Sequence, residues 1–240
     1  MNLDQKYLYL SINLLSVAVP FAFSFYPKAN FSRKWRYLVP AILIPAVLFT
    51  IWDAAFAQMG IWGFNPDYLS GIYVGNLPLE EVMFFICIPY ACVFTYEALK
   101  HLIKSDHLAV QKKFISITIA VASLLVTVLF WDRWYTATTF SGLAIFVLFL
   151  YRNNAPFLGR FYFTYLILLI PFFIVNGALT GSFSREPVVW YNDGENLRIR
   201  IGTIPVEDMF YGLFLLLMNV SIFEWMQTKR NNSREQAGLE

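Results

Sequence analysis

The sequence predicts an all-α membrane protein: a seven-helix transmembrane bundle of two parallel three-helix repeats joined by a linker helix, with the N-terminus outside. Three observations support this prediction. Of the 240 residues, 58% are hydrophobic and only 14% are charged, a balance unlike that of soluble domains. Seven apolar stretches approach or exceed the ~17–20 residues that a spanning helix needs. A short acidic motif also occurs twice at a wide spacing.

The acidic motif opens two of the apolar stretches. Residues 75–81 read GNLPLEE, and residues 202–208 read GTIPVED, 127 positions later. The same offset relates Arg33 to Arg160 without a gap. A constant offset of this kind indicates two copies of one structural unit. Because acids are costly inside a membrane segment, their presence in both copies indicates a function.

Seven helices are expected in chain order. The first is preceded by Asp4 and Lys6 and lacks a small-residue cleavage site, so we predict a retained helix rather than a signal peptide. Pro78 and Pro205 suit a first helical turn, where no backbone N–H is needed. The expected helices span residues 7–27, 35–58, 78–98, 113–131, 134–151, 160–180 and 204–226.

The offset of 127 places the first three helices on the last three and leaves the fourth without a counterpart. An extra crossing restores the chain direction, so the two units should lie parallel, related by an axis along the membrane normal. We therefore divide the chain into a first repeat (1–105), a linker helix (106–132) and a second repeat (133–240). This plan puts both acidic motifs on one side of the membrane.

Lys and Arg are distributed unevenly between the two sides. Thirteen lie in the loops after the first, third and fifth helices and in the C-terminal tail, and five lie on the opposite side. The positive-inside rule then places the N-terminus and both acidic motifs outside and the C-terminus in the cytoplasm.

The outer segments before each motif are expected to be ordered. Residues 62–67 precede the first motif and residues 188–201 precede the second. The second segment has Asp193 and Gly194 at its centre and alternating side chains on both sides, which predicts a short β-hairpin. Two such segments would cap a cavity among the helices, or would form ordered loops without a gating role.

The motif acids Glu80, Glu81, Glu207 and Asp208 are the main candidates for catalysis. Attraction to the helix dipole, worth ~0.3–1 kcal/mol per acid, is a sufficient structural explanation for one acid in each motif. Neighbouring residues on a helix point ~100° apart, so one acid of each pair should face a cavity and the other a neighbouring element. A protonated acid in a dry cavity can act as a Brønsted acid, whereas acids in a wet site would be ionised.

Asp53 is a further acid near the outer side of the second helix, and Asn176 lies roughly at the corresponding place in the sixth. Either residue could orient a motif acid or accept a proton, or could simply join helices by polar contacts. Glu97 and Glu224 repeat near the cytoplasmic ends and are expected to pair with Lys or Arg.

Aromatic residues make up 19% of the chain. Interface belts and helix packing are their default roles in membrane proteins. Rings that line a dry cavity also stabilise a positive charge through their π-faces. An acid within an aromatic pocket would suit protonation and rearrangement of a lipid-soluble alkene. The candidate substrate-binding residues are Trp52, Trp62, Phe64, Phe84, Asn176, Tyr191 and Tyr211.

Four segments carry a resemblance to a known family: TIWD at 50–53, GIWGFNPDY at 60–68, PLEE at 78–81 and PVEDMFY at 205–211. They resemble the integral-membrane lycopene cyclase domain family, in the fused tandem form of the heterodimeric-type bacterial lycopene β-cyclase. The resemblance covers almost the whole chain.

The resemblance implies lycopene β-cyclase activity, a non-redox isomerisation of two ψ-ends to β-rings through γ-carotene to β-carotene. It assigns the family's acidic motif to Glu80, Glu81, Glu207 and Asp208, with Asp53 as a further catalytic candidate. The chain departs from internal symmetry where Asn176 stands opposite Asp53. Because the motifs share one side, we predict one composite pocket that processes one end at a time.

The same resemblance implies an integral protein of the bacterial inner membrane. Its expected partners are lycopene, related carotenoids and the lipid bilayer, with no nucleic acid; self-association and association with other carotenoid enzymes are both compatible with it. We expect no cofactor and no metal, because the reaction is not a net oxidation. The sequence also contains no Gly-x-Gly-x-x-Gly run of the dinucleotide-binding type.

Several other functions share part of this pattern. A cyclase that acts on a C50 carotenoid or forms ε- or γ-type ends is compatible with the same residues. A small transporter with parallel repeats shares the topology but does not explain the doubled acids. A retinal receptor is disfavoured because the seventh helix has no Lys, and a prenyl transferase because aspartate-rich magnesium sites are lacking.

Overall fold

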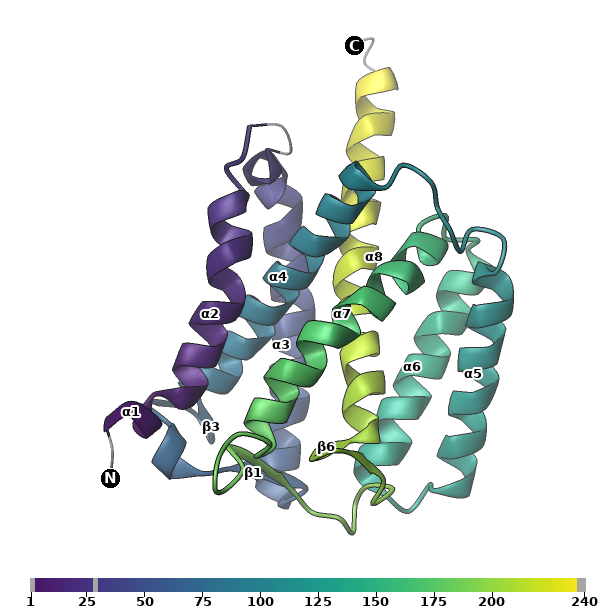
Figure 1. Cartoon of the computed structure of the whole chain (residues 1–240). Helices are drawn as coiled ribbons and strands as arrows, with labels where there is room; N and C mark the ends of the chain where they lie inside the picture. Colours follow the sequence, from purple (N-terminus) through teal and green to yellow (C-terminus); the bar gives the residue numbers. More distant parts are fainter. Residues whose placement is uncertain (1–2, 28–29, 237–240) are drawn as a thin grey trace.

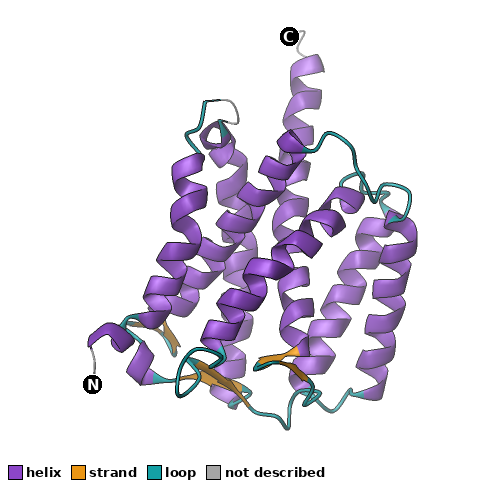
Figure 2. Cartoon of the chain, viewed as in Figure 1, coloured by secondary structure: helices purple, strands orange, loops and turns teal. Residues whose placement is uncertain are grey.

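The computed structural model describes residues 3–27 and 30–236 and shows a bundle of helices with short strands gathered at one end (Figures 1 and 2). This confirms the predicted helical class. Six of the described helices, α3 to α8, are long and apolar enough to cross a membrane. The helices are α1 (Leu3–Lys6), α2 (Leu8–Phe23), α3 (Trp35–Met59), α4 (Leu79–Leu102), α5 (Lys112–Leu129), α6 (Trp134–Arg152), α7 (Leu158–Leu179) and α8 (Val206–Gln236), with 3₁₀ turns η1 (Phe31–Lys34) and η2 (Pro66–Tyr68).

The first long helix is shorter than the sequence suggests. The predicted span of 7–27 becomes α2, which has 16 residues and ends at Phe23. The backbone N–H of Ser24 donates to the Pro20 carbonyl at 3.0 Å and caps this end. Pro27 follows shortly, and the residue before a proline is disfavoured in a helix.

The two three-helix units lie parallel, as the offset predicts. The first helix of each unit packs against the third, α2 on α4 and α6 on α8. Across the units, the second helix of one contacts the third helix of the other, so that α3 packs on α8 and α7 on α4. The linker helix α5 packs mainly on α6, at the side of the bundle (Figure 1). Both acidic motifs therefore lie at the end of the bundle that carries the N-terminus. The domain division at residues 105 and 132 stays a prediction.

Each acidic motif is preceded by the same two-stranded turn. Strand β2 (Tyr73–Val74) pairs with β3 (Leu77–Pro78), and β5 (Arg200–Ile201) pairs with β6 (Ile204–Pro205), in identical antiparallel register. Gly75 and Gly202 both have φ of 65°, a left-handed conformation that strains residues with a Cβ. Helices α4 and α8 begin directly after the proline of each turn. The repeat is thus visible in backbone detail.

The predicted hairpin within residues 188–201 is wrong. Strand β4 (Val189–Tyr191) pairs instead with β1 (Trp62–Phe64) of the other repeat, antiparallel, with Gly63 opposite Trp190. The Trp190 ring lies over Gly63, where an added Cβ would approach the ring to 2.3 Å. The absence of a side chain at Gly63 thus makes room for the pairing between the repeats. This pairing joins the two units at the end of the bundle that carries the acidic motifs.

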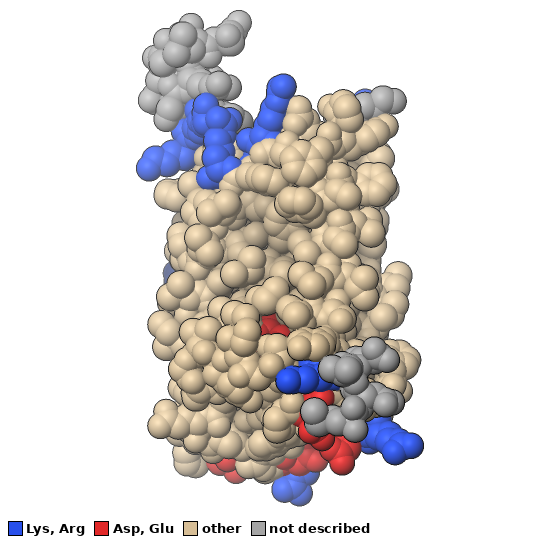
Figure 3. Space-filling view, turned by 90° about the vertical axis from the view of Figure 1, so that its left-hand side faces the viewer, with Lys and Arg blue, Asp and Glu red and all other residues tan. Residues whose placement is uncertain are grey.

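The opposite end of the bundle is basic and ion-paired. Lys34 pairs with Glu97, and Lys100 pairs with Glu224 at 2.6 Å, which confirms the predicted pairing of the two repeated glutamates. These pairs tie η1, α4 and α8 together. Lys and Arg gather at this end in Figure 3, above a broad uncharged band that suits a membrane interior.

Candidate active site

A cavity of about 310 Å³ opens among α2, α4, α7 and α8, and residues of strands β1 and β4 form part of its wall. Its walls are mainly apolar and aromatic. Three carboxyl groups line it among the described residues: Asp53 from α3, Glu81 from α4 and Asp208 from α8. Both repeats therefore contribute acids to one composite cavity, as the parallel arrangement predicts.

The two acids of each motif face different surroundings. Glu81 and Asp208 line the cavity, whereas Glu80 and Glu207 do not. The Oε1 atom of Glu80 accepts the backbone N–H of Ser70 at 2.7 Å, and that of Glu207 accepts the N–H of Leu197 at 2.6 Å. The donors lie ten residues before each acid. The first acid of each motif thus fastens the preceding outer segment to the helix start.

Further contacts support an anchoring role for these first acids. Both side chains are fully buried. Asn13 donates to the Glu80 carbonyl at 2.7 Å, and the Thr136 hydroxyl donates to Glu207 Oε1 at 2.7 Å. The structure therefore does not bring Glu80 and Glu207, which the sequence suggested as catalytic, to the cavity wall.

Phenols hold the two motif acids that line the cavity. The Tyr9 hydroxyl donates to Glu81 Oε2 at 2.6 Å. The Tyr135 hydroxyl donates to Asp208 Oδ1 at 2.6 Å, and Tyr191 donates to Asp208 Oδ2 at 2.9 Å. Asp208 therefore has a donor on each oxygen, whereas one phenol holds Glu81.

Asp53 completes the group of acids. It is 3% exposed, and its Oδ2 has no hydrogen-bond partner within the part of the chain that the structure describes. It lies near enough to Glu81 to interact electrostatically, and Glu81 interacts in the same way with Asp208. Three carboxyl groups in one apolar space are costly unless they share protons. We call the part of the cavity that these three acids line the acid chamber.

Aromatic rings enclose the acid chamber. The Trp62 ring lies 5.0 Å from Tyr135 and 6.3 Å from both Tyr191 and Tyr211, measured between centroids. Rings in such a group can stabilise a cation through their π-faces. Six of the seven predicted substrate-binding residues line the cavity: Trp62, Phe64, Phe84, Asn176, Tyr191 and Tyr211.

The seventh, Trp52, lies behind the wall. Its ring packs on Tyr211 at 5.2 Å and on Phe56 at 5.8 Å and does not line the cavity. Trp52 therefore supports a wall residue rather than facing the space.

Sequence reasoning missed Tyr9 and Tyr135. Each is the second residue of the first helix of its repeat. The strict offset of 127 pairs Tyr9 with Thr136, so the two phenols are out of register by one position. Only the observed helix starts, Leu8 and Trp134, make the two phenols equivalent, because the predicted starts at residues 7 and 134 keep the strict offset of 127.

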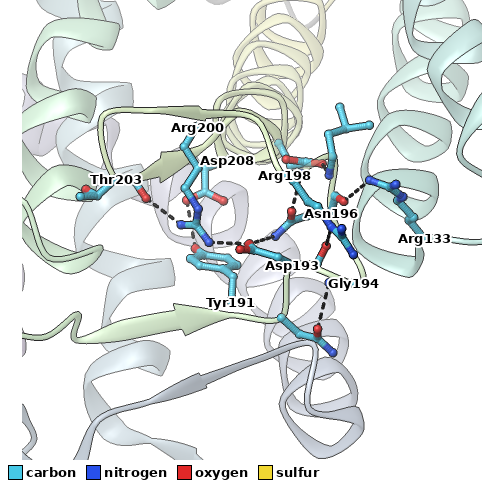
Figure 4. A network of polar contacts seen from close by, with 12 residues as sticks. Arg133, Tyr191, Asp193, Gly194, Asn196, Arg198, Arg200, Thr203 and Asp208 are labelled. Carbon is cyan, nitrogen blue, oxygen red and sulfur yellow. Dashed lines mark hydrogen bonds and ion pairs between the residues drawn. The ribbon is translucent and has the colours of Figure 1, made fainter.

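An ordered outer loop covers the Asp208 side of the chamber (Figure 4). Arg200 pairs with Asp193 at 2.7 Å, and its guanidinium lies 5.9 Å from the Tyr191 ring centroid. Hydrogen bonds from Arg200 and Asn196 hold the pKa of the Asp193 carboxyl below its ordinary value. Burial, together with the nearby Asp208, raises the pKa of the Tyr191 phenol well above its ordinary value. Tyr191 thus stays a proton donor to Asp208 at neutral pH.

Comparisons with known proteins agree with this architecture. The family model described as Lycopene cyclase matches residues 6–99 and again residues 132–226. A curated protein of Aspergillus niger, named bifunctional lycopene cyclase/phytoene synthase, is 24% identical over an alignment of 208 residues, and the match covers 80% of this chain. The chain spans about a third, 34%, of the length of that relative. No solved structure matches.

The first matched segment contains α2, α3 and most of α4, the second contains α6, α7 and most of α8, and the linker helix α5 lies between them. Each segment includes one acidic motif and the phenol that holds its cavity-facing acid. Together the segments make up well over half of the chain, and this chain belongs to the lycopene cyclase family.

Proposed function

We propose that the chain is a lycopene β-cyclase that closes rings at carotenoid ends by acid–base chemistry in the acid chamber. The observation that carries this proposal is the meeting of Asp53, Glu81 and Asp208 from both repeats inside an aromatic cavity. Carboxylic acids can donate and accept protons, and the surrounding rings can stabilise the cation between those two steps.

The proposed reaction consumes and releases one proton per ring. A carboxylic acid protonates the terminal double bond of the ψ-end, which leaves a tertiary cation. The electron pair of the next double bond attacks this cation and closes the ring, which moves the positive charge onto a ring carbon. A carboxylate then removes a proton from the adjacent ring carbon and forms the β-ring double bond. Composition is unchanged, so no oxidant or reductant is consumed.

The hydrogen bonds suggest different roles for the acids. Asp208 accepts a phenol O–H on each oxygen, and hydrogen bonds to a carboxylate are stronger than those between neutral groups. We assign to Asp208 the carboxylate that faces the cation and removes the ring proton. Glu81 and Asp53 lie together with fewer donors, and we assign to this pair the proton that starts the reaction.

We further propose that the chain lies in the bacterial cytoplasmic membrane with its acidic motifs toward the outer side. The gathering of Lys and Arg at the opposite end supports this orientation. The partners that this proposal implies are carotenoids and the lipids in which they dissolve.

Expression in a bacterium that accumulates lycopene tests the function. We expect the red lycopene to be replaced by β-carotene, with γ-carotene as an intermediate, when pigments are separated by chromatography. A chain that carries Glu81→Gln together with Asp208→Asn serves as the control for expression without chemistry. Unchanged lycopene in cells with abundant membrane-inserted wild-type protein would refute the proposal. An ε- or γ-type ring would show a cyclase with a different product from the one proposed.

A further inference from the structure

The cavity continues well beyond the acid chamber, along α4 toward the basic end of the bundle. Its wall includes Glu81 and, fourteen residues later, Thr95. At 1.5 Å per helical residue this separation is about 21 Å. We call this extension the arm; it is lined by Ser16 and Pro20 of α2, Ala91 and Thr95 of α4, and Leu168 and Pro171 of α7.

The hydroxyl groups in the wall of the arm already have acceptors. The Ser16 hydroxyl donates to the Ile12 carbonyl at 2.7 Å, and the Thr95 hydroxyl donates to the Ala91 carbonyl at 2.8 Å. The Tyr165 hydroxyl, also in the wall, donates to the carbonyl of Met209. Because these hydroxyls donate to backbone carbonyls, the arm offers a largely apolar surface, which suits an apolar chain.

The arm is open to the side of the bundle. Pro171 is exposed, and Ser16 and Ala91 are partly exposed, although all three line the cavity near the middle of their helices. At that depth in a membrane the surroundings are lipid acyl chains. Figure 3, which faces one side of the bundle, shows a small patch of acidic atoms amid otherwise uncharged surface. The exposed part of the lining on α2 and α7 marks the place where the cavity opens toward the bilayer.

We propose that the arm binds the polyene chain of a carotenoid, which enters from the bilayer between α2 and α7 and places one end in the acid chamber. This inference rests on the proposed function. The occupant follows from three features: the arm is continuous with the acids, its hydroxyl groups donate to backbone carbonyls, and it opens to lipid rather than to water. An extended carotenoid can span a hydrocarbon core of ~30 Å, so a cavity that measures about 21 Å from Glu81 to Thr95 leaves the second end in the bilayer. The one-ringed product must then leave and re-enter in the opposite direction.

Blocking the arm without touching the acids tests this inference. Ala91→Trp would fill the arm, and Ile86→Trp is a matched control on the same helix, because Ile86 is 41% exposed and does not line the cavity. Both variants are compared with wild type for ring formation from lycopene in liposomes, with the melting temperature in detergent as the measure of folding. We expect Ala91→Trp to form rings at least tenfold more slowly than wild type and Ile86→Trp to form them within twofold of the wild-type rate.

A short substrate separates a blocked arm from a damaged chamber. The probe is a chain-shortened apolycopenal that carries one ψ-end and ends before the level of Ala91. We expect Ala91→Trp to cyclise this probe at the wild-type rate while it fails on lycopene. Equal activity of Ala91→Trp and wild type on lycopene would overturn the inference. Loss of activity on both substrates in the folded variant would overturn it as well. A wild-type protein that cyclises neither substrate would instead refute the proposed function.

Discussion

Replacing Glu81 by Gln, or Asp208 by Asn, is expected to slow ring formation by ~10²–10⁴-fold, the usual contribution of a general acid or base. Each amide keeps nearly the shape of the acid, and its oxygen can still accept from Tyr9 or Tyr135. It cannot give or take the proton that the proposed reaction needs. The initial rate of ring formation from lycopene, at equal amounts of folded protein in liposomes, measures the effect.

The first acid of each motif provides the sharpest comparison. Glu80→Gln leaves an oxygen that can accept the Ser70 N–H. The change weakens at most one hydrogen bond, worth about 1 kcal/mol, so we expect at most about a tenfold loss of rate. Asp67→Asn, at an exposed outer position, should leave the rate unchanged. If Glu80→Gln and Glu81→Gln lowered the rate of ring formation equally in folded protein, the division of roles within the motif would be wrong.

Tyr135→Phe is expected to reduce the rate by roughly 10–100-fold, because a hydrogen bond to a charged group contributes ~1.5–3 kcal/mol. The variant keeps the ring that packs on Trp62 and removes only the donor to Asp208 Oδ1. The loss should appear in kcat more than in KM, since the phenol positions a reacting carboxylate rather than the substrate.

Tyr162→Phe is the matched control for this change. Tyr162 is also buried, its hydroxyl shares a hydrogen bond of 2.8 Å with Ser116, and it does not line the cavity. We expect it to lower the melting temperature slightly and to leave kcat unchanged. Equal losses of kcat in the two variants would indicate that Tyr135 acts only through stability.

Much of the fold could be predicted because its signals are long or repeated. Apolar length locates most helix bounds to within a few residues, as in α3, predicted at 35–58 and observed at Trp35–Met59. The offset of 127 predicted the parallel units, and Gly75 and Gly202 adopt the same φ of 65°. A doubled acid at a helix start predicted that one member of each pair would face a cavity, because neighbouring residues on a helix diverge.

Other features depend on contacts that one sequence does not encode locally. The pairing of β1 with β4 joins segments more than a hundred residues apart, and alternation alone favoured a local hairpin. Which acid of each motif faces inward depends on how α4 and α8 are rotated against their neighbours. The same reason explains why Trp52 lies behind the wall while Trp62 lines it. Tyr9 and Tyr135 were not predicted, because they occupy equivalent places relative to the observed starts of α2 and α6 but not under the sequence offset of 127.

Isotope transfer from solvent tests most directly whether protein carboxyls deliver the proton that closes the ring. The protein is equilibrated in deuterium oxide, where carboxyl and phenol protons exchange, and is then given unlabelled lycopene. Mass spectrometry of the cyclised pigment should show one deuterium retained for each ring formed. Rings formed by folded, active protein without deuterium would contradict proton delivery by exchangeable acids.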